Sequence, residues 1–546
     1  MKRLLVCLVV LVLTIPACSF AMAEGAVLGV VDTAYGQAQG VAADAPYAGV
    51  TLFKGIPYAA PPVGDLRWAA PEDPAAWDGV KLFDTYADAA MQWPGDMDAE
   101  PWHTDFYYNT YPTFSEDCLY LNVTTSATEG DEKMPVFIWM HGGGLNHGYS
   151  YEVEFAAEAL AQKGVVVVTV GTRLGVFGYM ALPQLDAETE YGGSGNYGVM
   201  DTIKAVDWVV QNIAAFGGDP ENITIGGQSG GTGKSAALLA SDKLETPVKQ
   251  YVFESNVQTG SFGTRNSYSP LETMEQKSVD YLVSLDLTGE ESIEDLRAMP
   301  ADFFMGTADN YKNAPQGYTL DGYYITYNNL YEAYLEGKLS GVRFLGGSNL
   351  SDNNYVPDVT DQATFETYFK TYFGDELWAK YDLDAMFSMV TDENANDWAR
   401  IIVSYVSLSA NRLFGVEMAK IYGDDFKLYT YLFTHRTPGR DSEHWWAWHS
   451  SEMWYSFGSL RDIPEQRDWQ EWDYELADIM TSYWSDFMKT GDPNGGDLTQ
   501  WLSADTMSYM ELGDADAIGC YDAYPVDVEG FEDLMLDYVR MTYGLE

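Results

Sequence analysis

The chain is poor in cysteine and, after its first residues, has no long hydrophobic stretch. Its 546 residues include only four cysteines, Cys7, Cys18, Cys118 and Cys520. The first two lie in the apolar N-terminal stretch and the others are far apart, so at most one disulfide is expected and a disulfide framework is excluded. No cysteine–histidine group has zinc-ligand spacing. No later stretch reaches the roughly 18 apolar residues that cross a membrane, so no stable membrane span is expected.

Basic residues are scarce as well. Lysine and arginine number 30 against 82 aspartates and glutamates, which gives a formal net charge of −52. Such a charge acts on solubility and non-specific binding rather than on the fold. It repels nucleic acid and anionic membranes, so we expect neither as a partner. Two interpretations of the acidity stay open: a surface suited to a salty or crowded extracellular medium, or steering of cationic substrates.

The N-terminus has the pattern of an export signal. Lys2 and Arg3 precede an apolar run from Leu4 to Ile15, and the small residues Ala21 and Ala23 mark a cleavage site. We expect residues 1–23 to be removed and the mature chain to be secreted or held in the cell envelope. The run is too short to favour a membrane anchor.

A lipoprotein modified at Cys18 is the other interpretation of this segment. The residues before this cysteine are Ile15-Pro16-Ala17, and the proline fits that pattern poorly.

The body of the chain predicts an α/β fold in one domain, residues 24–546. Short apolar runs alternate with helical patterns, as is typical of a mostly parallel sheet covered by helices on both faces. Strands are expected at residues 135–140, 165–170, 223–225, 342–345 and 428–433. Helices are expected at residues 154–163, 201–216 and 233–239, and a helical insertion at about 266–338. The composition, 46% hydrophobic and 14% aromatic, is sufficient for a large core.

A nucleophile motif follows the third strand. Residues 227–231 read Gly-Gln-Ser-Gly-Gly, which matches the G-x-S-x-G elbow of α/β-hydrolases and places Ser229 at its centre. The elbow requires a strand before the serine and a helix after it, and both are predicted. Glycines flank the serine because side chains there would collide with the strand and the helix.

The same segment also has to be compared with a phosphate-binding loop. Gly230 to Ser235 follow a strand and end in Gly-Lys-Ser, but the first glycine of the G-x-x-x-x-G-K pattern would fall on Gln228. The register therefore fails by one residue. We expect Lys234 to be a solvated residue in the first turn of the helix.

A glycine triplet follows the first strand. Residues 141–144 read His-Gly-Gly-Gly, as in the oxyanion loop of lipases and esterases. Acyl transfer places negative charge on the carbonyl oxygen, so backbone N–H groups must approach it without obstruction by side chains. Gly143 and Gly144, together with Gly230, are the expected donors. The alternative is a flexible turn.

Further motifs show that the chain resembles the type-B carboxylesterase family, the cholinesterase-like α/β-hydrolases. Two N-terminal segments resemble its signatures, Phe-Lys-Gly-Ile-Pro-Tyr-Ala at residues 53–59 and Glu-Asp-Cys-Leu-Tyr-Leu-Asn-Val at residues 116–123. Segments at residues 195–198, 212–220 and 490–494 also match. The resemblance covers nearly the whole mature chain.

The resemblance implies a triad in the chain order serine, acid, histidine. Residues 448–453, Trp-His-Ser-Ser-Glu-Met, resemble the histidine segment of the family and point to His449 as general base, with His444 as the close competitor. Asp352 falls on the acidic position, which is usually glutamate, and Asp358 and Asp361 are rival acids. Aspartate orients the histidine in many other triads.

Other positions depart from the family pattern. Gln228 stands where the family commonly has glutamate before the serine. Gly230 replaces the usual alanine after the serine, and this glycine keeps the backbone N–H. Met91 occupies the place of the cysteine that normally bridges to the Cys118 position, so Cys118 is expected to be a buried free thiol.

These residues predict a serine carboxylic ester hydrolase that acts on a small-molecule ester through an acyl-enzyme, without cofactor or metal. The alternative is a catalytically silent binding or adhesion protein, because the same fold also serves that role. An aromatic segment, residues 102–114, resembles the loop beside the substrate gorge of the family. The sequence leaves the ester and the oligomeric state undefined.

Overall fold

The computed structural model describes residues 27–93, 112–246, 248–255, 268–352, 356, 358–439, 442–461 and 467–545. The predicted signal segment and residues 102–111 of the aromatic segment lie outside these residues. No helix in the described ranges is both long enough and apolar enough to cross a membrane.

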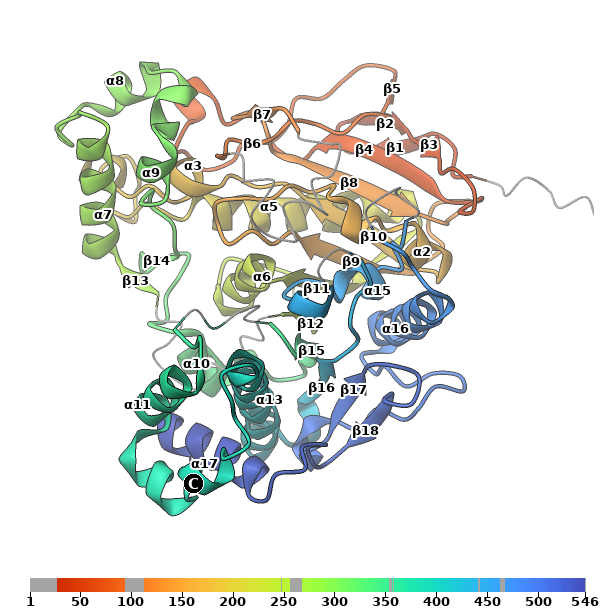
Figure 1. Cartoon of the computed structure of the whole chain (residues 1–546). Helices are drawn as coiled ribbons and strands as arrows, with labels where there is room; N and C mark the ends of the chain where they lie inside the picture. Colours follow the sequence, from red (N-terminus) through yellow and green to blue (C-terminus); the bar gives the residue numbers. More distant parts are fainter. Residues whose placement is uncertain are drawn as a thin grey trace, which may run out of the picture.

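The centre of the molecule is a large twisted sheet (Figure 1), to which eleven strands of the described chain belong. In sequence order they are β3 (Val41–Ala42), β4 (Thr51–Pro57), β8 (Tyr120–Thr125), β9 (Met134–Met140), β10 (Val166–Val170), β11 (Gly218–Gln228), β12 (Gln250–Glu254), β15 (Arg343–Asn349), β16 (Lys427–Phe433), β17 (Tyr509–Leu512) and β18 (Gly519–Tyr521). In space the order is β18-β17-β16-β15-β12-β11-β9-β10-β8-β4-β3. The strands from β10 to β17 pair in parallel, and the strands at both edges pair antiparallel.

The strand β9 shows why the central strands are apolar throughout. Successive side chains of a strand point to opposite faces of a sheet. Phe137 and Trp139 therefore pack into one hydrophobic cluster, while Ile138 and Met140 pack into the cluster on the other face. Because helices cover both faces, neither set of side chains meets water, which confirms the expectation of a mostly parallel sheet between two helical layers.

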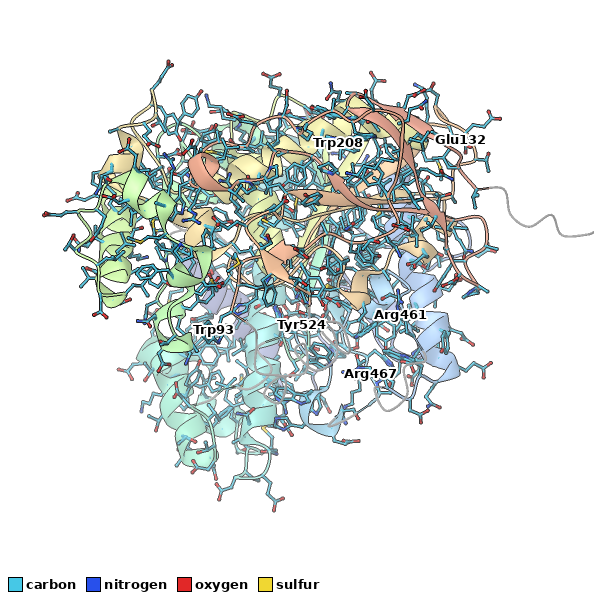
Figure 2. All side chains as sticks on the ribbon, turned by 90° about the horizontal axis from the view of Figure 1, so that it is seen from above. Trp93, Glu132, Trp208, Arg461, Arg467 and Tyr524 are labelled. Carbon is cyan, nitrogen blue, oxygen red and sulfur yellow. The ribbon has the colours of Figure 1, made fainter. Side chains whose placement is uncertain are left out.

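Two sets of helices provide these layers. On the side of Ile138 the cluster includes residues of α5 (Tyr197–Asn212), α6 (Gly230–Ala240), α11 (Gln362–Lys380), α13 (Ala395–Tyr422) and α17 (Phe531–Tyr543). On the side of Trp139 it includes residues of α2 (Glu158–Gln162), α15 (Met453–Ser456) and α16 (Glu471–Thr490). Side chains fill the space between the layers (Figure 2), where Trp208 of α5 is 2% exposed.

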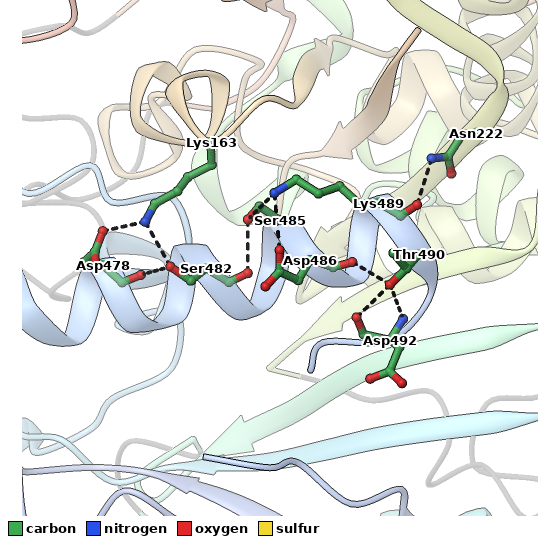
Figure 3. A network of polar contacts seen from close by, with 9 residues as sticks. All are labelled: Lys163, Asn222, Asp478, Ser482, Ser485, Asp486, Lys489, Thr490 and Asp492. Carbon is green, nitrogen blue, oxygen red and sulfur yellow. Dashed lines mark hydrogen bonds and ion pairs between the residues drawn. The ribbon is translucent and has the colours of Figure 1, made fainter. Parts of the chain in front are cut away.

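Polar side chains tie α16 to its neighbours (Figure 3). Lys163, which directly follows α2, donates to Asp478 at 2.5 Å and to Ser482 at 2.9 Å. At the other end of the helix, the Asn222 amide of β11 donates to the Lys489 carbonyl oxygen at 3.2 Å. Exposed pairs of this kind contribute little stability, so the buried aromatic face of α16 supplies most of the packing energy.

A helical insertion forms the part of the molecule drawn in light green in Figure 1. It contains α7 (Leu271–Ser284), α8 (Ile293–Ala298) and α9 (Ala308–Tyr311), which pack with α3 (Gly175–Tyr179) in a third hydrophobic cluster. The described part of the predicted insertion therefore contains several helices, joined by turns and loops, and two two-residue strands, β13 (Ser269–Pro270) and β14 (Thr319–Leu320).

The described part of the chain also contains short strands and helices. The strands are β1 (Val31–Thr33), β2 (Gly36–Gln39), β5 (Val80–Leu82), β6 (Ala89–Ala90) and β7 (Phe114–Ser115). The short helices are α4 (Pro183–Asp186), α10 (Leu330–Ala333), α12 (Leu383–Met386) and α14 (Ser442–Trp445). Cys118 is buried and free, as predicted, and Cys520 is a half-buried free thiol.

Candidate active site

Ser229 occupies a strained turn between β11 and α6. The strand ends at Gln228 and the helix begins at Gly230, so the turn consists of the serine alone. Its φ of 53° and ψ of −117° lie in a region that L-residues with a side chain rarely adopt. Such strain persists only where the surroundings enforce it, and it is typical of functional sites.

Close packing explains the flanking glycines. A Cβ at Gly227 would lie 2.4 Å from the carbonyl carbon of Gly231, and a Cβ at Gly231 would lie 1.9 Å from the Met140 carbonyl oxygen. Both collisions are with backbone atoms, which no side-chain rotation relieves. The local sequence therefore permits the tight strand–turn–helix that the motif predicted.

Asp352 and His449 meet at the same edge of the sheet as Ser229. The carboxyl ends of parallel strands share one edge, and Asp352 lies three residues beyond the end of β15. A parallel bridge pairs Ser351 with Trp448, and the Ser351 N–H donates to the Ala447 carbonyl oxygen at 2.9 Å. These backbone contacts place the two side chains next to each other.

The contact between the two side chains is short. His449 Nδ1 lies 2.6 Å from Asp352 Oδ1, and both side chains are mostly buried. The other ring nitrogen, Nε2, faces the elbow, where it lies 3.3 Å from the amide nitrogen of Gln228. Burial acts to lower the pKa of His449, but the charge of Asp352, its hydrogen bond and the charge of Glu452 outweigh burial and raise the pKa above its ordinary value.

The rival residues lie elsewhere. Asp361 caps α11 by accepting from the Thr364 N–H at 2.8 Å. Asp358 is exposed, and His444 is exposed on α14. Of the predicted acids and bases, the structure brings only Asp352 and His449 into contact within the described residues.

The glycines predicted as oxyanion donors lie against one another. The Gly144 carbonyl oxygen would be 2.0 Å from a Cβ at Gly230, so the glycine loop lies directly over the first turn of α6. Gly143 and Gly144 have φ of 82° and 62°, which glycine adopts freely. In the described part of the chain none of the N–H groups of Gly143, Gly144 and Gly230 donates a hydrogen bond. All three are therefore available to a ligand.

A second buried carboxyl group lies behind the histidine, and sequence reasoning missed it. Glu452 is fully buried, and it accepts hydrogen bonds from the Ser255 hydroxyl and, at 2.6 Å, from the Asn349 amide. Burial, followed by the charge of Asp352, raises the pKa of Glu452 to about 7. Its position three residues after His449 was visible in the sequence, but its partners come from strands far away in the chain.

Lys234 corrects a prediction. It was expected to be solvated, yet it is 2% exposed. The helix α6 begins at Gly230, one turn earlier than the expected residue 233, and Lys234 therefore lies on the side of α6 that faces His141 rather than water. No cluster of three or more histidine, cysteine, aspartate or glutamate side chains in the described ranges could hold a metal ion.

Comparisons with known proteins identify the family of the chain. A model of the Carboxylesterase family matches residues 28–520. Fumonisin B1 esterase of Sphingopyxis macrogoltabida is 30% identical over 491 residues, which span 86% of this chain and 83% of that protein. Para-nitrobenzyl esterase of Bacillus subtilis (strain 168) is 30% identical over 488 residues, 85% of this chain and 90% of that protein.

Solved structures show the same fold. A PNB esterase superimposes with a TM-score of 0.73 at 26% identity, covering 93% of this chain and 99% of that one. The carboxylesterase Est55 of Geobacillus stearothermophilus gives a TM-score of 0.70 at 26% identity with the same coverage. This chain belongs to the carboxylesterase family and is a carboxylic ester hydrolase with the α/β-hydrolase fold.

Proposed function

We propose that the chain hydrolyses carboxylic esters of small molecules through a Ser229–His449–Asp352 triad and a covalent acyl-enzyme. The observation that carries the proposal is the 2.6 Å contact between Asp352 and His449 Nδ1, with Nε2 turned to the elbow that holds Ser229. A carboxylate on Nδ1 fixes the tautomer in which Nε2 carries no hydrogen and can accept a proton.

The first half of the reaction acylates the serine. As Ser229 Oγ attacks the ester carbonyl carbon, His449 Nε2 takes the hydroxyl proton, and Asp352 stabilises the imidazolium that forms. The N–H groups of Gly143, Gly144 and Gly230 stabilise the negative charge on the carbonyl oxygen. When the tetrahedral intermediate collapses, the C–O bond to the alcohol breaks and the alcohol leaves with the proton from His449.

The second half releases the acid. His449 takes a proton from a water molecule, which attacks the acyl carbon held on Ser229. The oxyanion forms again in the same place, the bond to Ser229 breaks, and the serine recovers its proton from His449. The chain's own residues thus account for each proton transfer.

The substitution Ser229→Ala tests this proposal. We expect the purified variant to lose hydrolysis of short p-nitrophenyl esters, by up to about 10⁶ in kcat, with an unchanged melting temperature. Wild-type turnover in the variant would refute the assignment. A wild-type protein inert to every p-nitrophenyl ester from acetate to octanoate would instead favour the silent binding protein; otherwise this series reports the preferred acyl length.

We also propose that the protein is exported, on the strength of its N-terminal sequence. N-terminal analysis of the protein recovered from its native host should give Glu24 as the first residue. A lipid-modified N-terminus at Cys18 would support the lipoprotein instead, and a retained Met1 would contradict both.

A further inference from the structure

A buried lysine lies beneath the proposed oxyanion loop and takes no part in the triad. The Lys234 ammonium lies 3.2 Å from the His141 carbonyl oxygen and 3.3 Å from His141 Nε2. Both residues are almost fully buried. Burying a lysine costs free energy. The burial of Lys234 therefore suggests that its two contacts with His141 serve a purpose.

The contacts determine the tautomer of His141. Its Nδ1 lies 2.9 Å from the Gly142 carbonyl oxygen, which can only accept, so Nδ1 carries the hydrogen and donates it. Nε2 is then unprotonated and accepts from Lys234. Burial and the charge of Lys234 lower the pKa of His141 well below its ordinary value, so the ring is neutral as this arrangement requires.

The Gly142 carbonyl belongs to the same peptide unit as the Gly143 N–H. A trans peptide is planar, and its C=O and N–H point in opposite directions. A hydrogen bond that holds the Gly142 oxygen toward His141 therefore also sets the direction of the Gly143 N–H. The bond from Lys234 to the His141 carbonyl oxygen fixes the preceding peptide unit in the same way.

We propose that Lys234 is a positioning residue of the oxyanion hole, acting through His141 to aim the N–H of Gly143 at the ester oxygen. The inference rests on the proposed function, in which that N–H binds the oxyanion. Lys234 lies on α6 beyond residues 227–231 of the elbow motif, so the motif itself assigns it no role.

The charges around Lys234 indicate that its N–H groups matter more than its charge. Burial lowers the pKa of Lys234 to about 7, against the charge of Glu152, which acts to raise it. Glu152 is itself buried, accepts from the Tyr149 N–H at 2.7 Å and interacts with the buried Glu154. The ammonium and the neutral amine both have N–H groups that can make the two contacts with His141.

Two substitutions separate hydrogen-bond donation from packing. Lys234→Met keeps an unbranched side chain but has no donor, whereas Lys234→Gln keeps an uncharged donor on a slightly shorter chain. For p-nitrophenyl butyrate we expect Lys234→Met to lower kcat by about 10- to 100-fold, because loss or misplacement of an oxyanion donor acts on the transition state. KM should stay close to wild type, and Lys234→Gln should recover a clear part of kcat. Equal kcat in the two variants, or wild-type kcat in Lys234→Met, would overturn the proposal.

A second measurement does not depend on activity and is made on the wild-type protein. Nitrogen-15 NMR of histidine-labelled wild-type protein, with His141 assigned by its loss in His141→Gln, should show a neutral ring protonated at Nδ1. An imidazolium, or a ring protonated at Nε2, would refute the role of Lys234. If the wild-type protein hydrolysed no ester, the proposed function would fail while this spectrum still decided the contact between Lys234 and His141.

Discussion

Replacing Gly230 by alanine would force apart the proposed oxyanion loop and the first turn of α6. The added Cβ would lie 2.0 Å from the Gly144 carbonyl oxygen and 2.6 Å from both the carbonyl carbon and the Cα of Gly144. Non-bonded heavy atoms prefer about 3.5 Å, so the loop or the first turn of α6 has to move by roughly 1 Å or more. All three atoms belong to the backbone, so a change of rotamer does not relieve the contact.

The size of the effect follows from this displacement. A misplacement of about 1 Å in a catalytic arrangement costs on the order of 10² in rate, which corresponds to about 2.7 kcal/mol of transition-state stabilisation. We therefore expect Gly230→Ala to lower kcat for p-nitrophenyl butyrate about 100-fold, with a smaller change in KM because the lost contact is made in the transition state.

A matched control lies one turn further along α6. At Gly233 an added Cβ would lie 3.0 Å from the Tyr318 hydroxyl oxygen, a side-chain contact that is much less close than the 2.0 Å backbone contact at Gly230. Gly233→Ala should therefore remain close to wild type in the same steady-state assay, with both melting temperatures recorded. Wild-type kcat in Gly230→Ala would refute the reasoning, because the loop would then not need its present position for catalysis.

Three further predictions concern the neighbouring groups. Asp352→Asn should lower kcat by about 10⁴, because the amide permits the wrong tautomer of His449, while Asp358→Asn should leave it unchanged; the reverse pattern would reassign the acid. His449 acts as a base when neutral, and the charge of Glu452 helps to raise the pKa of His449. Glu452→Gln should therefore shift the acid limb of the kcat/KM profile to lower pH, and a shift to higher pH would contradict this. Since burial raises the pKa of the Cys118 thiol, it should resist iodoacetamide in the folded protein and be alkylated without prior reduction after denaturation, whereas a disulfide-linked peptide found by mass analysis would show the thiol is not free.

Local patterns predicted the elbow and five of the eleven strands that the described part of the sheet contains, namely β9, β10, β11, β15 and β16. The apolar run at residues 135–140 predicted β9 almost to the residue, because its side chains are buried on both faces. The strand before the serine was predicted only over residues 223–225, yet β11 extends to Gln228. Gly226 and Gly227 have no side chains, so they add nothing to the hydrophobic pattern from which a strand is predicted.

The interior polar contacts could not be predicted in the same way. Glu452 accepts from Ser255 and Asn349, which follow β12 and end β15 respectively, so the contact depends on the spatial order of the strands. Lys234 looked solvated because Gly, Thr and Lys early in a helix carry no apolar signal. Its burial depends on how closely the glycines allow α6 to approach the loop that contains His141.

The most direct test of the account is to locate the covalent bond that it requires. A fluorophosphonate probe should react once per chain, and mass analysis of the digested protein should place the adduct on Ser229. Labelling should be absent in Ser229→Ala and strongly slowed in His449→Gln, which cannot accept the hydroxyl proton. An adduct on another residue, or undiminished labelling of Ser229→Ala, would contradict the assignment of Ser229 as nucleophile.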